Sequence, residues 1–298
     1  MADIRQLLKD YLDYLEIEKN RSLRTRRNYE HYLNAFFQKG KITALKELTP
    51  EKIKDFRLAL AREENLKKST QAYYIIALRN FLRYLIKQDY EVISPDKIEL
   101  PKIPQRQIEV ADSSEVERLL NAPEGADLRS LRDRAILETF FSTGLRLSEL
   151  CKLSRYLNFD QGEISVRGKG EKLRLVFLSS SARQTIKNYL AKRGDADEAL
   201  FISLTKNKSK PEVIGRITPR AVQRLVNYYA RKAGITKRLT PHGLRHLFAT
   251  DLLMNGADLR SVQELLGHSS ISTTQVYTHV TNRHLREVHS AFHGKRRS

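Results

Sequence analysis

Cysteine, tryptophan and long apolar runs are scarce or absent in this sequence of 298 residues. The single cysteine, Cys151, excludes an internal disulfide and any zinc site built from several thiolates. Because Cys151 lies between Leu150 and Leu153, we expect a small buried side chain rather than a nucleophile. No apolar run reaches the roughly 18 residues of a transmembrane helix, and the charged start is unlike a signal peptide. We therefore expect a soluble, cytoplasmic protein.

Acidic residues are outnumbered by basic ones. The 35 Asp and Glu residues stand against 54 Lys and Arg residues, which gives a formal net charge of +19. Because Lys and Arg side chains displace counterions from phosphates, this surplus predicts salt-dependent binding to a nucleic acid. An anionic membrane surface would attract the same charges, so composition alone leaves that alternative open.

The N-terminal third of the sequence has apolar side chains at helical spacing, which predicts four amphipathic helices packed as a bundle. We expect Ser22 to cap the second helix, Thr49 with its following proline to begin the third, and Ser69 to cap the fourth. The apolar pattern stops between residues 94 and 110, where three prolines occur. This break predicts a linker between two domains, at residues 1–93 and 111–298.

The second half is also mostly helical in pattern, with one predicted hairpin. Its strands are expected at residues 163–167 and 173–178, joined by a glycine-rich turn that carries Lys169. A further short strand is expected at residues 199–203. Helices are expected over residues 219–232, 241–254, 259–266 and 284–292. The predicted fold class is mainly α (α+β), with a helical N-terminal domain and a mostly helical C-terminal domain that holds a small β-hairpin or sheet.

Seven of the eight histidines lie between His242 and His293, which raises the question of a metal site. His242 and His246 are four residues apart, a spacing that fits two metal ligands on one helix. The glutamate of a zinc hydrolase is missing between them, and the neighbouring Arg245 disfavours a second cation. We therefore expect no metal and no cofactor, and a structural role for His246.

Arginine, tyrosine and lysine side chains suit a metal-free attack on a phosphodiester. The pentacoordinate phosphorane spreads negative charge over its non-bridging oxygens, and guanidinium groups donate paired hydrogen bonds to such oxygens. Arg146 and Arg245 are candidates for this role. Tyr277 is the candidate nucleophile, since a covalent phosphotyrosine conserves the energy of the broken bond. Lys169 is the candidate acid for the leaving hydroxyl, and Lys172 in the same turn could also reach a phosphate.

Five motifs follow one another in a fixed order along the second half. They occupy residues 143–150 (TGLRLSEL), 168–172 (GKGEK), 242–246 (HGLRH), 265–268 (LLGH) and 277–280 (YTHV). With these motifs the sequence resembles the tyrosine recombinase (lambda integrase) family, and within it most closely the Xer site-specific recombinases. The helical first half and its linker resemble the SAM-like core-binding domain of that family.

The resemblance implies a role for each matched residue. Tyr277 would attack the scissile phosphate and form a 3′-phosphotyrosine link, which releases a 5′-hydroxyl. Arg146 and Arg245 would hold the non-bridging oxygens, and Lys169 would protonate the leaving 5′-oxygen.

Four further residues have supporting roles in this interpretation. His242 would assist proton transfer at the tyrosine, and His268 would donate a hydrogen bond to the phosphate. Glu149, one helical turn beyond Arg146, would orient its neighbours, and Lys172 would contact the DNA.

The resemblance also implies an assembly on DNA. Four protomers would pair two specific double-stranded sites and pass through a Holliday junction, as in the resolution of chromosome or plasmid dimers. Leu285, Val288 and Phe292 lie on one face of the last predicted helix, which would pack on its own domain or on a neighbouring subunit. The need for an accessory protein or a second recombinase stays open, because residues 154–160 and Phe177 depart from the usual Xer pattern.

Three other functions remain as alternatives at this point. A mobile-element integrase of the same family would use the same residues. A type IB topoisomerase shares the chemistry, although the motif spacing and the helical N-terminal domain argue against it. A non-catalytic DNA-binding protein would use the same basic surface without cleavage.

Overall fold

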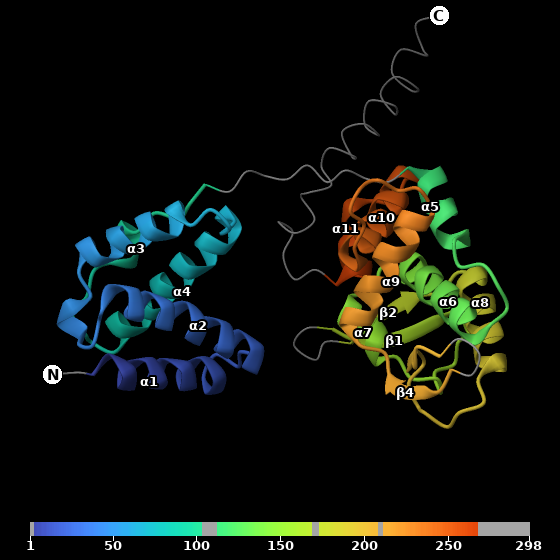
Figure 1. The fold of residues 1–298 in the computed structure, drawn as a ribbon, viewed down its shortest axis with the longest axis horizontal. Helices are drawn as coiled ribbons and strands as arrows, with labels where there is room; N and C mark the ends of the chain where they lie inside the picture. The colour runs from blue at the N-terminus through green and yellow to red at the C-terminus, as the bar shows by residue number, and fades with distance from the viewer. Residues whose placement is uncertain (1–2, 103–111, 169–172, 208–210, 268–298) are drawn as a thin grey trace, which may run out of the picture. The chain divides into compact units, whose positions relative to one another are not determined.

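The computed structural model describes residues 3–102, 112–168, 173–207 and 211–267. The chain divides into two compact units, Met1–Arg106 and Gln107–Ser298, and each is treated separately below (Figure 1). Within the described ranges the chain is mostly helical, with two small antiparallel sheets, so the predicted fold class is confirmed. None of the helices in those ranges is long and apolar enough to cross a membrane.

The first unit consists of four helices around an aromatic-rich core. Helices α2 and α4 pack against each other, and α1 and α3 pack against this pair. Tyr11, Phe36 and Phe81 are among its fully buried side chains. Its helices are α1 (Ile4–Ile17), α2 (Leu23–Gly40), α3 (Pro50–Arg62) and α4 (Lys68–Lys87), with short 3-10 helices η1 (Leu45–Glu47) and η2 (Pro95–Lys97).

Two of the three predicted helix caps in this unit are confirmed. The side chain of Ser22 accepts a hydrogen bond from the backbone N–H of Thr25, and Thr49 caps α3 in the same way. The prediction for Ser69 was wrong. Helix α4 begins one residue before Ser69, because the backbone N–H groups of Thr70 and Gln71 both donate to the carbonyl of Lys67.

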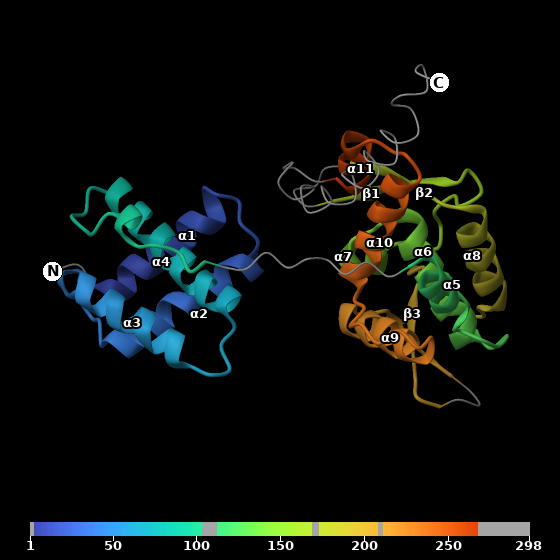
Figure 2. The ribbon, with the colours of Figure 1, turned by 90° about the horizontal axis from the view of Figure 1, so that it is seen from above.

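The second unit is built around α6, whose central part is buried on all sides. Every residue from Ala135 to Phe140 is buried, and α5, α8, α10 and β2 pack around the helix (Figures 1 and 2). The described helices are α5 (Ser113–Asn121), α6 (Leu128–Thr143), α7 (Leu147–Lys152), α8 (Ser180–Lys192), α9 (Pro219–Lys232), α10 (Pro241–Met254) and α11 (Leu259–Leu266). The last three match the predicted ranges, whereas residues 284–292 lie outside the described residues.

Four short strands form two antiparallel pairs in this unit. Strands β1 (Glu163–Arg167) and β2 (Leu173–Phe177) form the predicted hairpin pairing. Strands β3 (Ile202–Leu204) and β4 (Val213–Arg216) form the second pair, and β4 was not predicted. The strand expected at 199–203 lies further along the chain, because Ala199 instead pairs with Ser154 and the Leu200 N–H donates to the Leu153 carbonyl.

Two glycines let the helices of the second unit approach closely. Gly144 ends α6 in the left-handed conformation with φ of 56°, and a Cβ atom there would lie 2.3 Å from the Phe248 ring of α10. Gly267 ends α11 in the same conformation, and a Cβ atom there would lie 2.8 Å from the Arg174 side chain of β2. These contacts bring the ends of α6 and α11 together with β2 and α10.

Candidate active site

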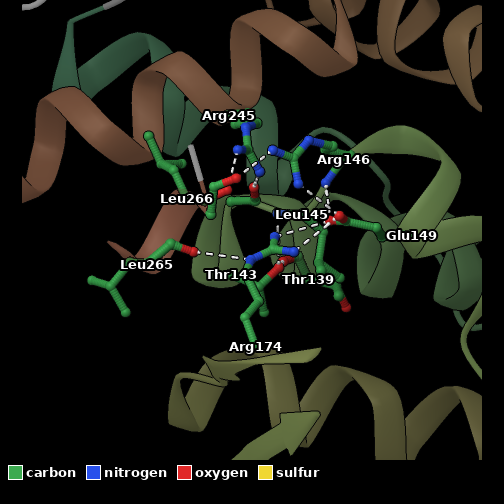
Figure 3. A network of polar contacts seen from close by, with 11 residues as sticks. Thr139, Thr143, Leu145, Arg146, Glu149, Arg174, Arg245, Leu265 and Leu266 are labelled. Atoms are coloured by element: carbon green, nitrogen blue, oxygen red, sulfur yellow. Dashed lines mark hydrogen bonds and ion pairs between the residues drawn. The ribbon is translucent and has the colours of Figure 1, made fainter. Parts of the chain in front are cut away.

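Three arginines from different elements converge on the C-terminal end of α11. Arg146 is the N-cap residue of α7, Arg174 lies on β2, and Arg245 lies on α10. Figure 3 shows their guanidinium groups gathered around Glu149 and the backbone of α11. We call Arg146, Arg174, Arg245 and Glu149 the arginine cluster.

Three consecutive carbonyls near the end of α11 each accept a hydrogen bond from a different arginine. Arg174 Nε donates to Leu265 at 3.2 Å, Arg245 Nη2 donates to Leu266, and Arg146 Nη2 donates to Gly267 at 2.8 Å. The last carbonyls of a helix have no intrahelical partner and form the negative end of its dipole. The end of α11 therefore holds three cations in fixed positions.

Glu149 is the anion of the cluster, and its side chain is only 4% exposed. Its carboxylate accepts from Arg174 Nη1 and Nη2, both at 2.9 Å, and from Arg146 Nη1 at 2.9 Å. The backbone N–H of Arg146 also donates to it, at 2.8 Å, which caps α7. Burial alone would raise the pKa of Glu149, but the bonds from Arg174 and Arg146 outweigh it and lower the pKa.

Arg245 is the most deeply buried of the three arginines, with 4% of its surface exposed. Its Nη1 donates to the Gly144 carbonyl at 2.5 Å, so one guanidinium joins α10 to the ends of α6 and α11. The side chain of Arg146, by contrast, is 31% exposed. With Glu149 ionised the cluster carries a charge of +2 (3 − 1), which suits a phosphate that gains negative charge during attack.

His242 lies on α10 one helical turn before Arg245, and its ring contacts that of His246. The two Nε2 atoms are 2.9 Å apart and the rings meet edge to face. The His242 side chain is partly exposed to solvent. Desolvation of its ring by the surrounding protein and the charge of Arg245 both lower its pKa. His242 is therefore neutral near pH 7 and able to accept a proton.

Models of two protein families match the chain. The phage integrase family covers residues 109–284, and the SAM-like N-terminal domain of phage integrases covers residues 8–89. The chain belongs to the phage integrase family, and it is a site-specific tyrosine recombinase. It is 37% identical to the tyrosine recombinase XerC of Thermodesulfovibrio yellowstonii over 98% of both chains. With XerC of Haemophilus influenzae strain PittEE it shares 39% identity over 96% of both chains.

Solved structures of recombinases have the same fold as this phage integrase family member. XerH bound to a palindromic difH substrate superposes with a TM-score of 0.72 at 25% identity, covering 95% of this chain and 83% of that one. The Tn1549 transposon integrase in complex with transposon right-end DNA gives a TM-score of 0.76 at 20% identity, covering 98% and 99% of the two chains. At that identity the second likeness concerns the fold alone.

The structure of this recombinase brings together some of the predicted site residues. Arg146, Glu149 and Arg245 meet in the arginine cluster, and His242 lies one turn away on α10. The other predicted residues, Lys169, Lys172, His268 and Tyr277, lie outside the described residues. In the described ranges no three His, Cys, Asp or Glu side chains form a group that could hold a metal ion.

Arg174 was missed by the sequence reasoning. It shares the inner face of the β1–β2 sheet with buried Val176, while Leu173, Leu175 and Phe177 of the same strand are exposed. Alternation of apolar and polar residues would have placed Arg174 on the solvent side. The inverted pattern, with three large apolar residues on one face and an arginine on the other, is the sequence signal that could have identified it.

Cys151 behaves as the sequence predicts. Its side chain is buried, and burial raises the pKa of its thiol to about 11. A thiol with this pKa is almost entirely protonated at neutral pH, which makes it a poor nucleophile.

Proposed function

We propose that this recombinase cuts and rejoins duplex DNA at a specific site through a 3′-phosphotyrosine intermediate. The proposal is supported by one observation above all: two motif arginines, Arg146 and Arg245, are held on the adjacent carbonyls of Gly267 and Leu266. Guanidinium groups fixed before the substrate arrives need no rearrangement to stabilise a developing negative charge. Arg146, the more exposed of the two, would meet the scissile phosphate first.

Four residues perform the bond chemistry in this proposal. The Tyr277 oxygen attacks the phosphorus and displaces the 5′-oxygen of the next nucleotide, which takes a proton from Lys169. Arg146 and Arg245 bind the non-bridging oxygens during this exchange. In the reverse direction the free 5′-hydroxyl attacks the phosphotyrosine bond, so neither a cofactor nor an external energy source is consumed.

The remaining site residues support these four. Neutral His242 accepts the proton of the Tyr277 hydroxyl, in agreement with its lowered pKa. His268 donates a hydrogen bond to the phosphate, Glu149 orients Arg146, and Lys172 contacts the DNA backbone.

We further propose the assembly that such chemistry requires. Residues 1–93 form the core-binding domain and residues 111–298 the catalytic domain, and the linker 94–110 lets them close around the duplex. Four protomers on two sites would exchange strands in two steps through a Holliday junction. The helix predicted from the sequence at 284–292, with Leu285, Val288 and Phe292, would exchange between neighbouring subunits.

The similarity to XerC and XerH proteins supports a proposal about the cellular role. We propose that the recombinase separates dimers of the chromosome or of plasmids after replication. A substrate of this kind places the recombinase in the cytoplasm.

Covalent capture on DNA tests the proposal directly. Cells or lysates containing the full chain are denatured, the protein-linked genomic fragments are sequenced, and the recovered site is built into a duplex with a nick beside the cleavage point. The wild-type protein should become covalently linked to this duplex, whereas Tyr277→Phe should bind it equally well without forming an adduct. An adduct with Tyr277→Phe, or none with the wild type on any recovered site, would contradict the proposal.

A further inference from the structure

Arg174 belongs to none of the sequence motifs, yet its side chain donates two hydrogen bonds to Glu149, whereas the side chain of Arg146 donates one. The Arg174 side chain is 11% exposed and donates to both oxygens of Glu149 and to the Leu265 carbonyl. One side chain of β2 is thus joined to α7 and to the end of α11. Residues placed in this way can set the geometry of a site without touching the substrate.

The bonds to Glu149 show what Arg174 does to its neighbour. A carboxylate has about four acceptor positions, two on each oxygen. Arg174 takes one position on each oxygen, and the backbone N–H of Arg146 takes another on Oε2. A single position, on Oε1, is left for the Arg146 side chain, which fills it with Nη1.

We propose that Arg174 is a positioning residue that keeps Arg146 available for phosphate. Without Arg174, the carboxylate of Glu149 could accept two bonds from the Arg146 guanidinium, since paired Arg–carboxylate bonds are the favoured geometry. Arg146 would then turn its paired donors toward Glu149 and away from the substrate. This inference rests on the proposed role of Arg146 in binding the scissile phosphate.

The contact with α11 adds a second effect of the same residue. Arg174 Nε holds the Leu265 carbonyl, and the Gly267 backbone packs against the Arg174 side chain. His268 follows Gly267 directly in the sequence. Arg174 therefore positions the backbone at Leu265 and Gly267. Gly267 carries the carbonyl that is bonded to Arg146, and it directly precedes His268 in the sequence.

Single-turnover cleavage of the nicked duplex carrying the captured site measures this role. For Arg174→Met we expect the cleavage rate to fall roughly 100-fold, because displacement of a reacting group by about an ångström has effects of that size. The dissociation constant for the duplex should stay within about threefold, since a positioning residue acts on Arg146 and not on the DNA itself. Arg174→Lys should be nearly as slow, because an ammonium group keeps the charge but not the two-pronged geometry.

A second substitution separates positioning from a general role in folding. In Arg174→Met, changing Glu149→Gln removes the charge that captures Arg146, so the double variant should recover about tenfold of the lost rate. A purely structural role predicts further loss. Arg216→Met is the matched control: Arg216 is also a strand arginine bonded to backbone carbonyls, those of Cys151 and Leu153, and it lies outside the cluster. It should cleave at nearly the wild-type rate.

The possible outcomes distinguish this inference from the proposed function. If the wild type forms the adduct and Arg174→Met cleaves equally fast, only the positioning role fails. A parallel loss of DNA affinity, or no recovery in the double variant, would also overturn it. If Arg174→Met melts below the assay temperature, Arg174→Lys decides, since it preserves the neutralisation of Glu149. Failure of the wild type itself to form an adduct refutes the proposed function.

Discussion

Two buried carboxylates of the second unit, Asp133 and Glu149, have pKa values that are shifted in opposite directions. Asp133 lies in α6 and pairs with Arg132, whose Nε and Nη2 both reach Oδ1, while the Tyr229 hydroxyl donates to Oδ2 at 3.1 Å. Burial raises the pKa of Asp133, and these donors do not compensate. For Glu149 the same burial is outweighed, and its pKa is lowered.

The difference lies in how many cations serve each carboxylate. Glu149 accepts hydrogen bonds from two arginine side chains and one backbone N–H, so that each of its oxygens accepts two hydrogen bonds. Asp133 has one arginine, and that arginine also donates to the Ile202 carbonyl. Ionised Glu149 is therefore a stable anchor for the arginine cluster, whereas ionised Asp133 is maintained at a cost to folding.

Removal of Arg132, the partner of Asp133, should produce the largest change in stability. Arg132→Met leaves Asp133 buried without the cation that is hydrogen-bonded to it, so we expect a loss of about 3–5 kcal/mol in the free energy of unfolding. Urea unfolding at pH 7 measures it. Arg134→Met, on the exposed side of the same helix, is the control and should change stability by less than about 0.5 kcal/mol. Equal stabilities for the two variants would show that Asp133 does not depend on its partner.

A smaller change is expected at the other oxygen of Asp133. Tyr229→Phe removes the hydroxyl donor to Oδ2, which should cost about 1.5 kcal/mol and raise the pKa of Asp133 further. Thermal or urea unfolding gives the first value, and its pH dependence gives the second. Tyr228→Phe is the matched control, because Tyr228 is next to Tyr229 in the sequence but is largely exposed. A gain in stability in Tyr229→Phe would contradict the assigned bond.

The pH dependence of stability should show the two carboxylates acting in opposite directions. The lowered pKa of Glu149 means that its contribution is present above pH of about 4 and is lost as the pH falls. The raised pKa of Asp133 means that protonation stabilises the fold, so its contribution decreases as the pH rises. Relative to Glu149→Gln, the wild type should lose stability on acidification, and relative to Asp133→Asn it should gain stability. Slopes of the same sign in both comparisons would disprove the contrast.

Helix boundaries in the second unit could be predicted from local sequence. Thr218 and Thr240 each precede a proline and cap α9 and α10, and Asp258 caps α11. Gly267 ends α11 with a positive φ. These signals act within a few residues, so pattern and capping rules identify them. The motif residues Arg146, Glu149 and Arg245 could likewise be selected in advance.

Contacts between distant segments could not be predicted in this way. The bonds of Arg174 reach residues 25 and 91 positions away, and its inward orientation opposes the apolar pattern of β2. Strand β4 has a bulged register with β3 and alternates only weakly in burial. Tertiary packing, not local preference, decides such positions.

The three carbonyls at the end of α11 make the length of this helix a fixed quantity. Each residue of an α-helix turns the backbone by about 100° and advances it by 1.5 Å. Inserting one residue before Leu265 would rotate all three carbonyls away from Arg174, Arg245 and Arg146 together. Substitutions on the exposed side of α11 are tolerable by this reasoning, but a change in residue count is not. The number of residues in α11 therefore determines how its end aligns with β2, α10 and α7.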